Sequence, residues 1–426
     1  MSCLKGFPMT HKMQVLFFGL SLLLLFAVAC TGEMGPAGPL GPAGAPGPMG
    51  PVGPPGEDAI VSQEYVGSEK CGQCHEDEYA RFMLSGHPYK LTKIEDGQPP
   101  RFPYDAITNG IRNPPEGYSW DDITYVIGGY GWKVRFIDDK GFIVTGDENS
   151  LTQYNYKNSF VDNLAEWVPY HPGEEKPYDC GVCHTTGYRP EGHQDDLEGI
   201  IGTWAFPGVQ CEACHGPGSR HSDDPYGVFM KVDRSSQMCG KCHSRGNPAQ
   251  IDAQNGFEKH HEQYEDIYNS KHFATPCVTC HDPHASTLFV DEALNPNKGI
   301  VQVCESCHFQ NERRNVRNHL GMDCVDCHMA PMAKSAQGNL ELLRGDIRSH
   351  QFAINTEPDA TQFNEDGTLV MPYLTLEYAC GSCHNGQKAS VLETAVLAAA
   401  ADGYHAKPTP TPEPTLEPKL TPTPEG

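Results

Sequence analysis

The sequence predicts a loop-rich fold with few regular elements beyond short helices and one small antiparallel β insertion. Three observations lead to this prediction. The 426 residues include 18 Cys, nearly all of them in Cys-x-x-Cys-His segments. Between residues 180 and 384 these segments follow one another too closely for long helices or strands to separate them. Only 38% of the residues are hydrophobic, so side chains alone supply little apolar material for a core.

The Cys-x-x-Cys-His segments are numbered sites 1 to 8 in chain order. They are Cys71/Cys74/His75, Cys180/Cys183/His184, Cys211/Cys214/His215, Cys239/Cys242/His243, Cys277/Cys280/His281, Cys304/Cys307/His308, Cys324/Cys327/His328 and Cys380/Cys383/His384. Two thiols at this spacing can bond to the two vinyl groups of one haem, and the following His can ligate the iron. A disulfide framework needs no such His, and a zinc ribbon needs two half-sites per metal. The pattern therefore predicts eight covalently bound haems c.

A chain with eight haems would pack its core around them, because the haems supply most of the buried apolar area. The fold class is then a multihaem cytochrome c fold. Site 1 stands apart from the others, and within the gap after it residues 118–147 alternate β-forming residues with Gly and Asp turns. We expect a tetrahaem domain over residues 59–250, with the β insertion at about 118–147, and a second tetrahaem domain over 251–406. An alanine-rich helix from about Ser390 to Asp402 should lead to His405.

The N-terminal segment is typical of an exported protein. Basic residues precede an apolar run over residues 15–29, which is too short for a comfortable membrane span but fits a signal sequence. The run ends at Cys30 in a pattern that resembles a bacterial lipobox, so we expect residues 1–29 to be a lipoprotein signal peptide and Cys30 to carry a lipid anchor. The alternative is an ordinary cleaved signal with a stray Cys. Either route gives an extracytoplasmic protein, in the periplasm or at the cell surface.

Low-complexity segments flank the haem region. Gly occupies every third position from 32 to 56, with Pro at many positions between, which is the collagen pattern. Residues 30–58 are therefore expected to form a collagen-like stalk, either as a homotrimer or as a single-chain polyproline spacer. Residues 407–426 are rich in Pro and Thr and are expected to form a disordered tail.

The histidines outside the eight segments are candidates for second axial ligands to iron. Eight of them are expected to act in this way: His87, His171, His221, His272, His284, His319, His350 and His405. We expect each to serve a neighbouring site, because a short loop cannot bring a His to the haem of its own segment. His193, His260 and His261 are interpreted as surface residues. Met329 and Met332 are expected to pack against a porphyrin rather than to ligate iron.

A family resemblance lies in the segments EKCGQCHEDEYARFMLSGH, CGVCHTTGY, GVQCEACHGPGSRH and MCGKCH, between Tyr65 and His243. Their order and spacing resemble the tetrahaem cytochrome c-554 of ammonia oxidisers. Further on, CVTCHDPH, CVDCHMAPMAKSA and RSHQF are similar to the wider clan that includes hydroxylamine oxidoreductase and octahaem reductases. The resemblance implies a mainly α-helical, loop-rich fold with haems in parallel-stacked and perpendicular pairs. The β insertion, the four further sites, the stalk and the tail depart from the tetrahaem pattern.

The clan contains both electron carriers and enzymes, so two functions stay open. The first is an electron conduit of closely spaced bis-His haems, with other redox proteins or an extracellular acceptor as partners and no catalytic residue. The second is an oxidoreductase acting on nitrite, hydroxylamine or tetrathionate at one open haem, with site 2 or site 4 as the candidate. No site has the Lys in place of His that some reductases of the clan use. The net charge of −24 argues against nucleic acid and anionic lipid headgroups as partners.

Overall fold

A computed structural model describes residues 63–104, 111, 113–260, 263–309, 319 and 321–406. These residues belong to one compact unit that begins at Ser62. The predicted signal peptide, the Cys30 anchor, the stalk and the tail lie outside the described residues. Within the part that the structure describes, no helix is long and apolar enough to cross a membrane.

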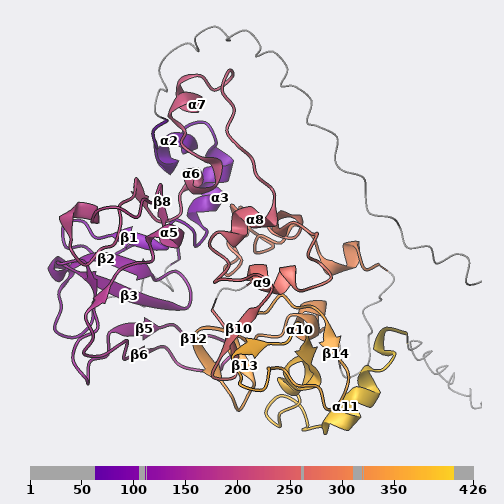
Figure 1. The fold of residues 1–426 in the computed structure, drawn as a ribbon. Coiled ribbons are helices and arrows are strands. Elements are labelled where there is room, and N and C mark those ends of the chain that lie inside the picture. The colour runs from indigo at the N-terminus through magenta and orange to yellow at the C-terminus, as the bar shows by residue number, and fades with distance from the viewer. Residues whose placement is uncertain are drawn as a thin grey trace, which may run out of the picture. The chain divides into compact units, whose positions relative to one another are not determined.

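The larger sheet holds seven short strands and includes the predicted β insertion (Figure 1). Its strands are β1 (Leu91–Lys93), β2 (Ile123–Gly128), β3 (Lys133–Asp138), β4 (Phe142–Ile143), β5 (Gln153–Asn155), β6 (Glu166–Val168) and β7 (Lys176–Pro177). Their order is β1-β2-β3-β4-β7, with β5 against β3 and β6 against β5. Every pairing is antiparallel. The sheet therefore extends beyond residues 118–147 on both sides.

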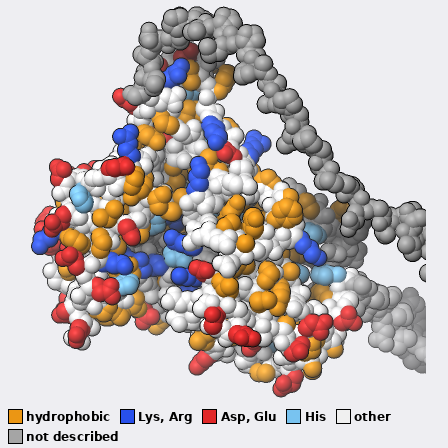
Figure 2. All heavy atoms as spheres, in the orientation of Figure 1, with side chains coloured by type: hydrophobic (Ala, Val, Ile, Leu, Met, Phe, Trp, Pro, Cys, Tyr) orange, Lys and Arg blue, Asp and Glu red, His pale blue; other side chains and the backbone are white. Residues whose placement is uncertain are grey.

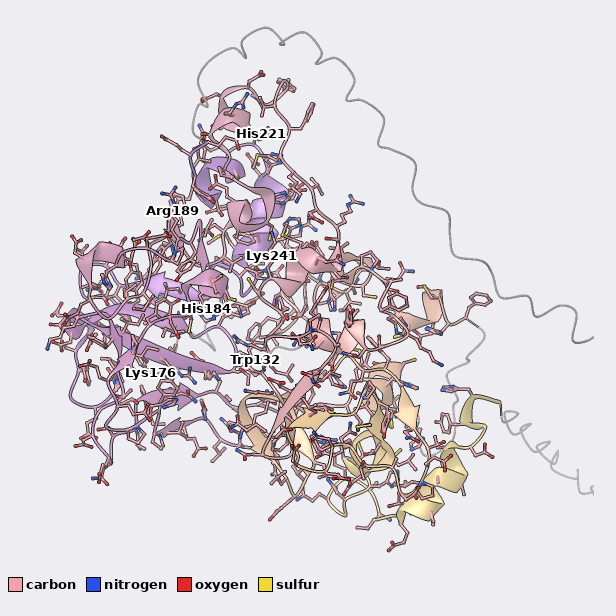
Figure 3. The ribbon with its side chains drawn as sticks, in the orientation of Figure 1. Trp132, Lys176, His184, Arg189, His221 and Lys241 are labelled. Carbon is pink, nitrogen blue, oxygen red and sulfur yellow. The ribbon has the colours of Figure 1, made fainter. Side chains whose placement is uncertain are left out.

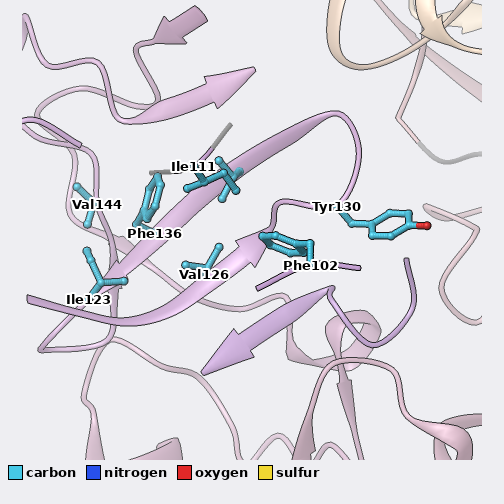
Figure 4. Packing of buried hydrophobic residues seen from close by; sticks show 8 residues of the cluster. Phe102, Ile111, Ile123, Val126, Tyr130, Phe136 and Val144 are labelled. Carbon is cyan, nitrogen blue, oxygen red and sulfur yellow. The ribbon is translucent and has the colours of Figure 1, made fainter. Parts of the chain in front are cut away.

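Both faces of the β2–β3 hairpin are buried, because successive side chains of a strand point to opposite faces. Val126 lies opposite Phe136 and Tyr125 opposite Ile137. On one face Val126 and Phe136 belong to a cluster that Figure 4 shows from close by. Its members are Phe102, Ile111, Ile123, Val126, Tyr130, Val134, Phe136 and Val144. On the other face Tyr125 and Ile137 pack with Trp204 and other buried residues. This side-chain core fixes the position of the sheet without help from a haem.

A second sheet has five strands in the order β13-β12-β11-β10-β15, with β11 and β12 parallel. Its strands are β10 (Ile251–Gln254), β11 (Phe257–Lys259), β12 (Ala333–Asn339), β13 (Arg344–Ile347) and β15 (Leu369–Val370). Two-stranded pairs are formed by β8 (Thr185–Thr186) with β9 (Phe206–Pro207) and by β14 (Ile354–Asn355) with β16 (Leu374–Thr375). Met332 is fully buried in the cluster that joins Ile251, Val370 and Leu374.

The helices are short, and most of them coincide with the sites. They are α2 (Ser68–Gly72), α3 (Glu76–Met83), α5 (Gly181–His184), α6 (Cys211–His215), α7 (Ser219–Asp223), α8 (Ser236–Gly240), α9 (Gln263–Tyr268), α10 (Cys324–His328) and α11 (Thr394–Ala401). A Cys-x-x-Cys-His segment needs only one helical turn, and the links between segments leave little room to extend it. The expectation of few regular elements is confirmed, but helices do not predominate over strands in the described part of the chain.

Two halves of the sequence meet within this unit. The Trp132 indole N–H donates to the backbone oxygen of Asp346 at 2.9 Å, and Lys133 donates to the backbone oxygen of Ser335. These hydrogen bonds join residues on the two sides of position 250. The expected division into two tetrahaem domains there stays a prediction.

Candidate haem-binding sites and a cationic cluster

Each site is a tight turn that brings its His back over its first Cys. In site 1 the His75 N–H donates to the Cys71 oxygen at 2.9 Å, and in site 4 His243 donates to Cys239 at the same distance. None of the sixteen site cysteines forms a disulfide within the described residues. The turn thus leaves two thiols and one imidazole available to a single group, which is the donor set that a haem c requires.

The surroundings of some predicted attachment residues do not by themselves indicate haem binding. Examples are Cys74, Cys307 and Cys383. Cys74 and Cys307 are exposed, whereas Cys383 is half-buried and its Sγ accepts a hydrogen bond from the Arg344 guanidinium at 3.3 Å. The expectation that these three thiols attach haem is therefore not confirmed by their local structure and stays a prediction from the spacing. Exposure does not conflict with it, because a thioether forms at the rim of a haem rather than beneath the ring.

Six of the eight site histidines face another histidine across a gap of nearly constant width. The pairs and their ring-centre distances are His75–His221 at 6.3 Å, His215–His284 at 6.3 Å, His308–His272 at 5.9 Å, His281–His350 at 6.1 Å, His384–His319 at 6.2 Å and His328–His405 at 6.0 Å. A metal–imidazole bond is about 2 Å and the ring centre lies roughly 1 Å farther, so two imidazoles on one iron have centres about 6 Å apart. The residues present therefore fit six-coordinate haem iron.

The angle between the paired rings differs strongly from site to site. The rings of His215 and His284 are inclined by only 4°. The two pairs at sites 1 and 7 are inclined by 25°. At sites 6 and 8 the angles are 68° and 73°. All six partners are among the eight histidines that the sequence suggested, and each comes from outside its partner's own segment.

The other two suggested histidines, His87 and His171, differ from one another. The pKa of His87 is lowered to about 3, first by burial and then by the nearby charge of His243, so these two residues are close in space. His171 is exposed and pairs instead with Glu174 at 3.0 Å. Its backbone has a φ of 46°, in a turn on the outside of the protein. The structure does not bring His171 to any described site histidine.

The three histidines interpreted as surface residues also differ. His193 is exposed, and its Nδ1 is 2.6 Å from the backbone oxygen of Ile200. His261 lies outside the described residues. His260 is half-buried, with its Nδ1 3.4 Å from a guanidinium nitrogen of Arg245, so its interpretation as a surface residue stays a prediction.

Site 2 differs from the six paired sites. Among the described residues, His184 forms no ring pair like the six above, and its Nδ1 is buried without a hydrogen-bond partner. His184 is one of the charges that lower the pKa of His260, so these two histidines lie in the same part of the protein. The pKa of His184 is lowered to about 3, first by burial and then by four positive charges. These are Lys90, Arg245, Arg135 and Lys133, in order of their effect. We call these four residues the cationic cluster.

The larger sheet positions half of the cationic cluster. Lys133 and Arg135 are two residues apart on β3 and therefore lie on the same face of the strand. The Arg135 guanidinium stacks on the ring of Tyr170, 3.6 Å from its centre, and donates to Gln153 at 2.6 Å. Both contacts hold the guanidinium in one orientation. Burial, followed by the charge of Arg135, lowers the pKa of Lys133 from 10.5 to about 7.

Loops supply the other half of the cluster. Lys90 precedes β1, its ammonium lies 6.0 Å from the Trp132 ring centre, and burial lowers its pKa. Arg245 follows site 4 directly. In Figure 2 Lys, Arg and His side chains gather in a hollow near the middle of the visible face, and Figure 3 marks His184 and Trp132. The cluster was not predicted from the sequence. The alternate positions of Lys133 and Arg135 in the predicted β insertion could have indicated two cations on one face of a strand.

Contacts between thiols show how the sites follow one another. The pKa of Cys71 is raised chiefly by a hydrogen bond with Cys211, that of Cys242 by one with Cys183, and that of Cys239 by one with Cys277. Weaker effects link site 3 with site 4, site 5 with site 6, site 6 with site 7 and site 7 with site 8. The sites thus form the series 1-3-4-5-6-7-8, and site 2 adjoins site 4.

Comparison with known proteins identifies several relatives. A family model described as cytochrome c554 and c-prime matches residues 150–216. The multiheme cytochrome MtrA of Shewanella baltica is 28% identical over 165 residues, which is 35% of this chain and 44% of that protein. The dissimilatory sulfite reductase MccA of Wolinella succinogenes is 21% identical over 373 residues, covering 62% of this chain and 50% of that protein. The chain thus spans about half the length of these curated relatives.

Solved structures show the same fold. The octaheme sulfite reductase MccA of Wolinella succinogenes superposes with a TM-score of 0.52 at 17% identity, covering 75% of this chain and 65% of that one. The outer cell wall cytochrome OcwA superposes with a TM-score of 0.50 at 18% identity, covering 78% of this chain and 86% of that one. At these identities the likeness concerns the fold alone.

Proposed function

The chain is a multihaem c-type cytochrome of the cytochrome c554-like clan, and from this we propose that it carries electrons among eight haems c and exchanges them with a small oxyanion at site 2. One observation carries the proposal: six site histidines pair with a histidine at about 6 Å, whereas His184 forms no such pair among the described residues and four positive charges lower its pKa. In this assignment the Cys residues of the sites attach the haems. The paired histidines are axial ligands, with His87 as the second ligand at site 4.

The series of paired sites is suited to electron transfer. When bound, the haems supply one-electron redox chemistry at iron. Two imidazoles per iron leave no position for a substrate and keep the bond lengths similar in both redox states, which makes transfer fast. Cys183 of site 2 lies close enough to Cys242 of site 4 to shift its pKa, so haems held at these two sites would supply a path for electrons between them.

The cationic cluster defines the class of substrate. Four positive side chains around one imidazole favour an anion, and Arg guanidinium groups bind oxyanions with paired hydrogen bonds. Hydroxylamine, which is neutral, gains nothing from this field. Nitrite and sulfur oxyanions fit it, and sulfite, which appears in the name of the Wolinella relative, belongs to the same class. Lys133 and Arg135 would orient the anion, and Lys133, with its lowered pKa, could supply a proton.

A spectroscopic count of haem spin states tests this proposal. We expect the ferric protein to show one high-spin haem among low-spin haems at low temperature. Sulfite or nitrite should change that high-spin signal, and carbon monoxide should bind one haem of the reduced protein. A protein with only low-spin haems and no response to carbon monoxide would contradict an open site 2.

That contrary result would favour a second candidate, an electron conduit alone. The six histidine pairs support this function by themselves. MtrA and OcwA are cytochromes whose names state no substrate, and they resemble the chain as closely as MccA does. Both functions share the proposed setting: an exported protein held at the membrane through Cys30, on a collagen-like stalk over residues 30–58 that forms a homotrimer or a spacer, with redox proteins or an extracellular acceptor as partners.

A further inference from the structure

Asp282 connects an axial histidine of one site to the helix that follows another. It lies between His281, which belongs to site 5, and His284, which faces His215 of site 3. One carboxylate oxygen is 3.1 Å from His284 Nδ1 and also accepts the backbone N–H of that residue at 2.9 Å. The other oxygen is 2.7 Å from the guanidinium of Arg81 on α3. The Asp282 side chain is only 16% exposed, so solvent screens these contacts weakly.

The paired histidines differ in what their Nδ1 atoms meet. The Nδ1 atoms of four of them lie 2.6–3.0 Å from backbone carbonyl oxygens; they are His215, His221, His328 and His384. Those of His272 and His281 are buried with no hydrogen-bond partner in the described structure. His284 meets a carboxylate, which is a charged acceptor and roughly twice as strong as a neutral one.

We propose that Asp282, held by Arg81, is a positioning residue for His284 that gives site 3 a lower reduction potential than site 5. A carboxylate that accepts the Nδ1 proton leaves Nε2 for the metal, fixes the ring plane and makes the imidazole a stronger donor. A stronger donor favours the more highly charged ferric iron. His281, without such a partner, favours it less. The proposal rests on the axial pairing of His215 with His284 proposed above.

The consequence is a direction for electron flow. Site 3 adjoins site 4, and site 4 adjoins both site 5 and site 2. With haems held at these sites, the difference would favour electron movement from site 3 through site 4 toward site 5, and site 2 branches off at site 4. The same five-residue segment Cys280–His284 supplies a ligand to site 5 and a ligand to site 3, so one local sequence sets the difference between them.

Three substitutions separate the geometric effect of Asp282 from its electronic effect. Asp282→Asn keeps an acceptor for the Nδ1 proton but removes the charge, and Asp282→Leu removes both. Asp326→Asn is the matched control: Asp326 lies inside site 7 and pairs with Arg348 at 2.9 Å, but it contacts no paired histidine ring. The readouts are a potentiometric titration followed by low-temperature electron paramagnetic resonance. The nearly parallel rings at 4° should give site 3 the most rhombic low-spin signal, because parallel imidazole planes split the iron d orbitals.

We expect Asp282→Asn to keep the rhombic signal and to shift its redox equilibrium about tenfold toward reduction, which is the lower end of the effect of losing an outer-shell partner. For a one-electron couple this is about 59 mV. Asp282→Leu should shift the equilibrium at least as far and also change the rhombic signal. Asp326→Asn should leave the site 3 signal unchanged. An unchanged potential in Asp282→Asn, or an equal shift in Asp326→Asn, overturns the proposal.

The pairing itself is tested apart from Asp282. His284→Ala should create one additional high-spin haem, and if it does not, the axial assignment at site 3 fails rather than the role of Asp282. If Asp282→Leu matures with fewer haems than the wild type, the comparison of Asp282→Asn with Asp326→Asn alone tests the role of Asp282. Both of these variants replace a carboxylate by a neutral amide of the same shape.

Discussion

Replacing Lys133 with Met should weaken anion binding and stabilise the fold at the same time. Lys133 is one of four positive charges around His184, and a charged hydrogen bond of this kind contributes about 1.5–3 kcal/mol. Its loss should raise the dissociation constant for sulfite or nitrite roughly 10- to 150-fold, since about 1.4 kcal/mol corresponds to a tenfold change.

The opposite effect on stability follows from the lowered pKa. Burial brings the pKa of Lys133 from 10.5 to about 7, so the folded state holds its proton less firmly than the unfolded state. The protonated lysine therefore costs stability below pH 7, by at most about 5 kcal/mol at 1.36 kcal/mol per pKa unit. That cost declines as the pH rises from 7 to 10.5. Lys133→Met removes the cost, so its stabilisation should be largest below pH 7.

Two titrations measure the effect of Lys133→Met on anion affinity and on the free energy of unfolding. Anion binding is followed on the high-spin signal, and unfolding is followed in guanidinium at pH 6 and pH 9. Lys176→Met is the matched control, because Lys176 lies on β7 of the same sheet but is not among the charges that act on His184. Wild-type anion affinity in Lys133→Met, or an equal loss in Lys176→Met, would refute the assignment of the cationic cluster to anion binding.

Four further outcomes are expected. A pyridine haemochrome assay with mass spectrometry should find eight covalent haems per mature chain; six or fewer would contradict the assignment of the sites. Low-temperature spectra should divide into rhombic signals from sites 1, 3 and 7, with ring angles of 4–25°, and large-g signals from sites 6 and 8, at 68° and 73°, and a single class would contradict the pairing. Cys30→Ser should release the protein from membranes, and continued membrane association would rule out the lipid anchor. Deletion of residues 32–58, which leaves Cys30 in place, should convert a trimer into a monomer in sedimentation, whereas an unchanged mass leaves only the spacer.

The haem sites could be predicted from the sequence because their residues have a fixed local spacing. A Cys-x-x-Cys-His segment carries its donor set within one helical turn, so no information about distant residues is needed to recognise it. The second ligands were harder, because each comes from a different segment. Six of the eight suggested histidines stand opposite a site histidine in the structure, which the context of residues such as His272 and His350 indicated.

Errors arose where long-range packing decides the outcome. Neither His171 nor His260 belongs to a Cys-x-x-Cys-His segment, so the local sequence does not show what surrounds either one. In the structure His171 is exposed beside Glu174, whereas His260 is half-buried beside Arg245. The predominance of helix was overestimated because the resemblance to tetrahaem cytochromes covers a part of the chain in which the β insertion was already an exception.

The sequence by itself determined what this protein binds: sixteen thiols and eight imidazoles at a fixed local spacing specify covalent haem, whatever the fold. It also determined that enough histidines exist to ligate every iron twice. Only the tertiary structure decided which histidine faces which of the six paired sites, and which positive charges act on His184. The physical reason is that Lys90, Lys133, Arg135 and Arg245 come from a loop, a strand and the end of another site, and only folding brings their charges to one place.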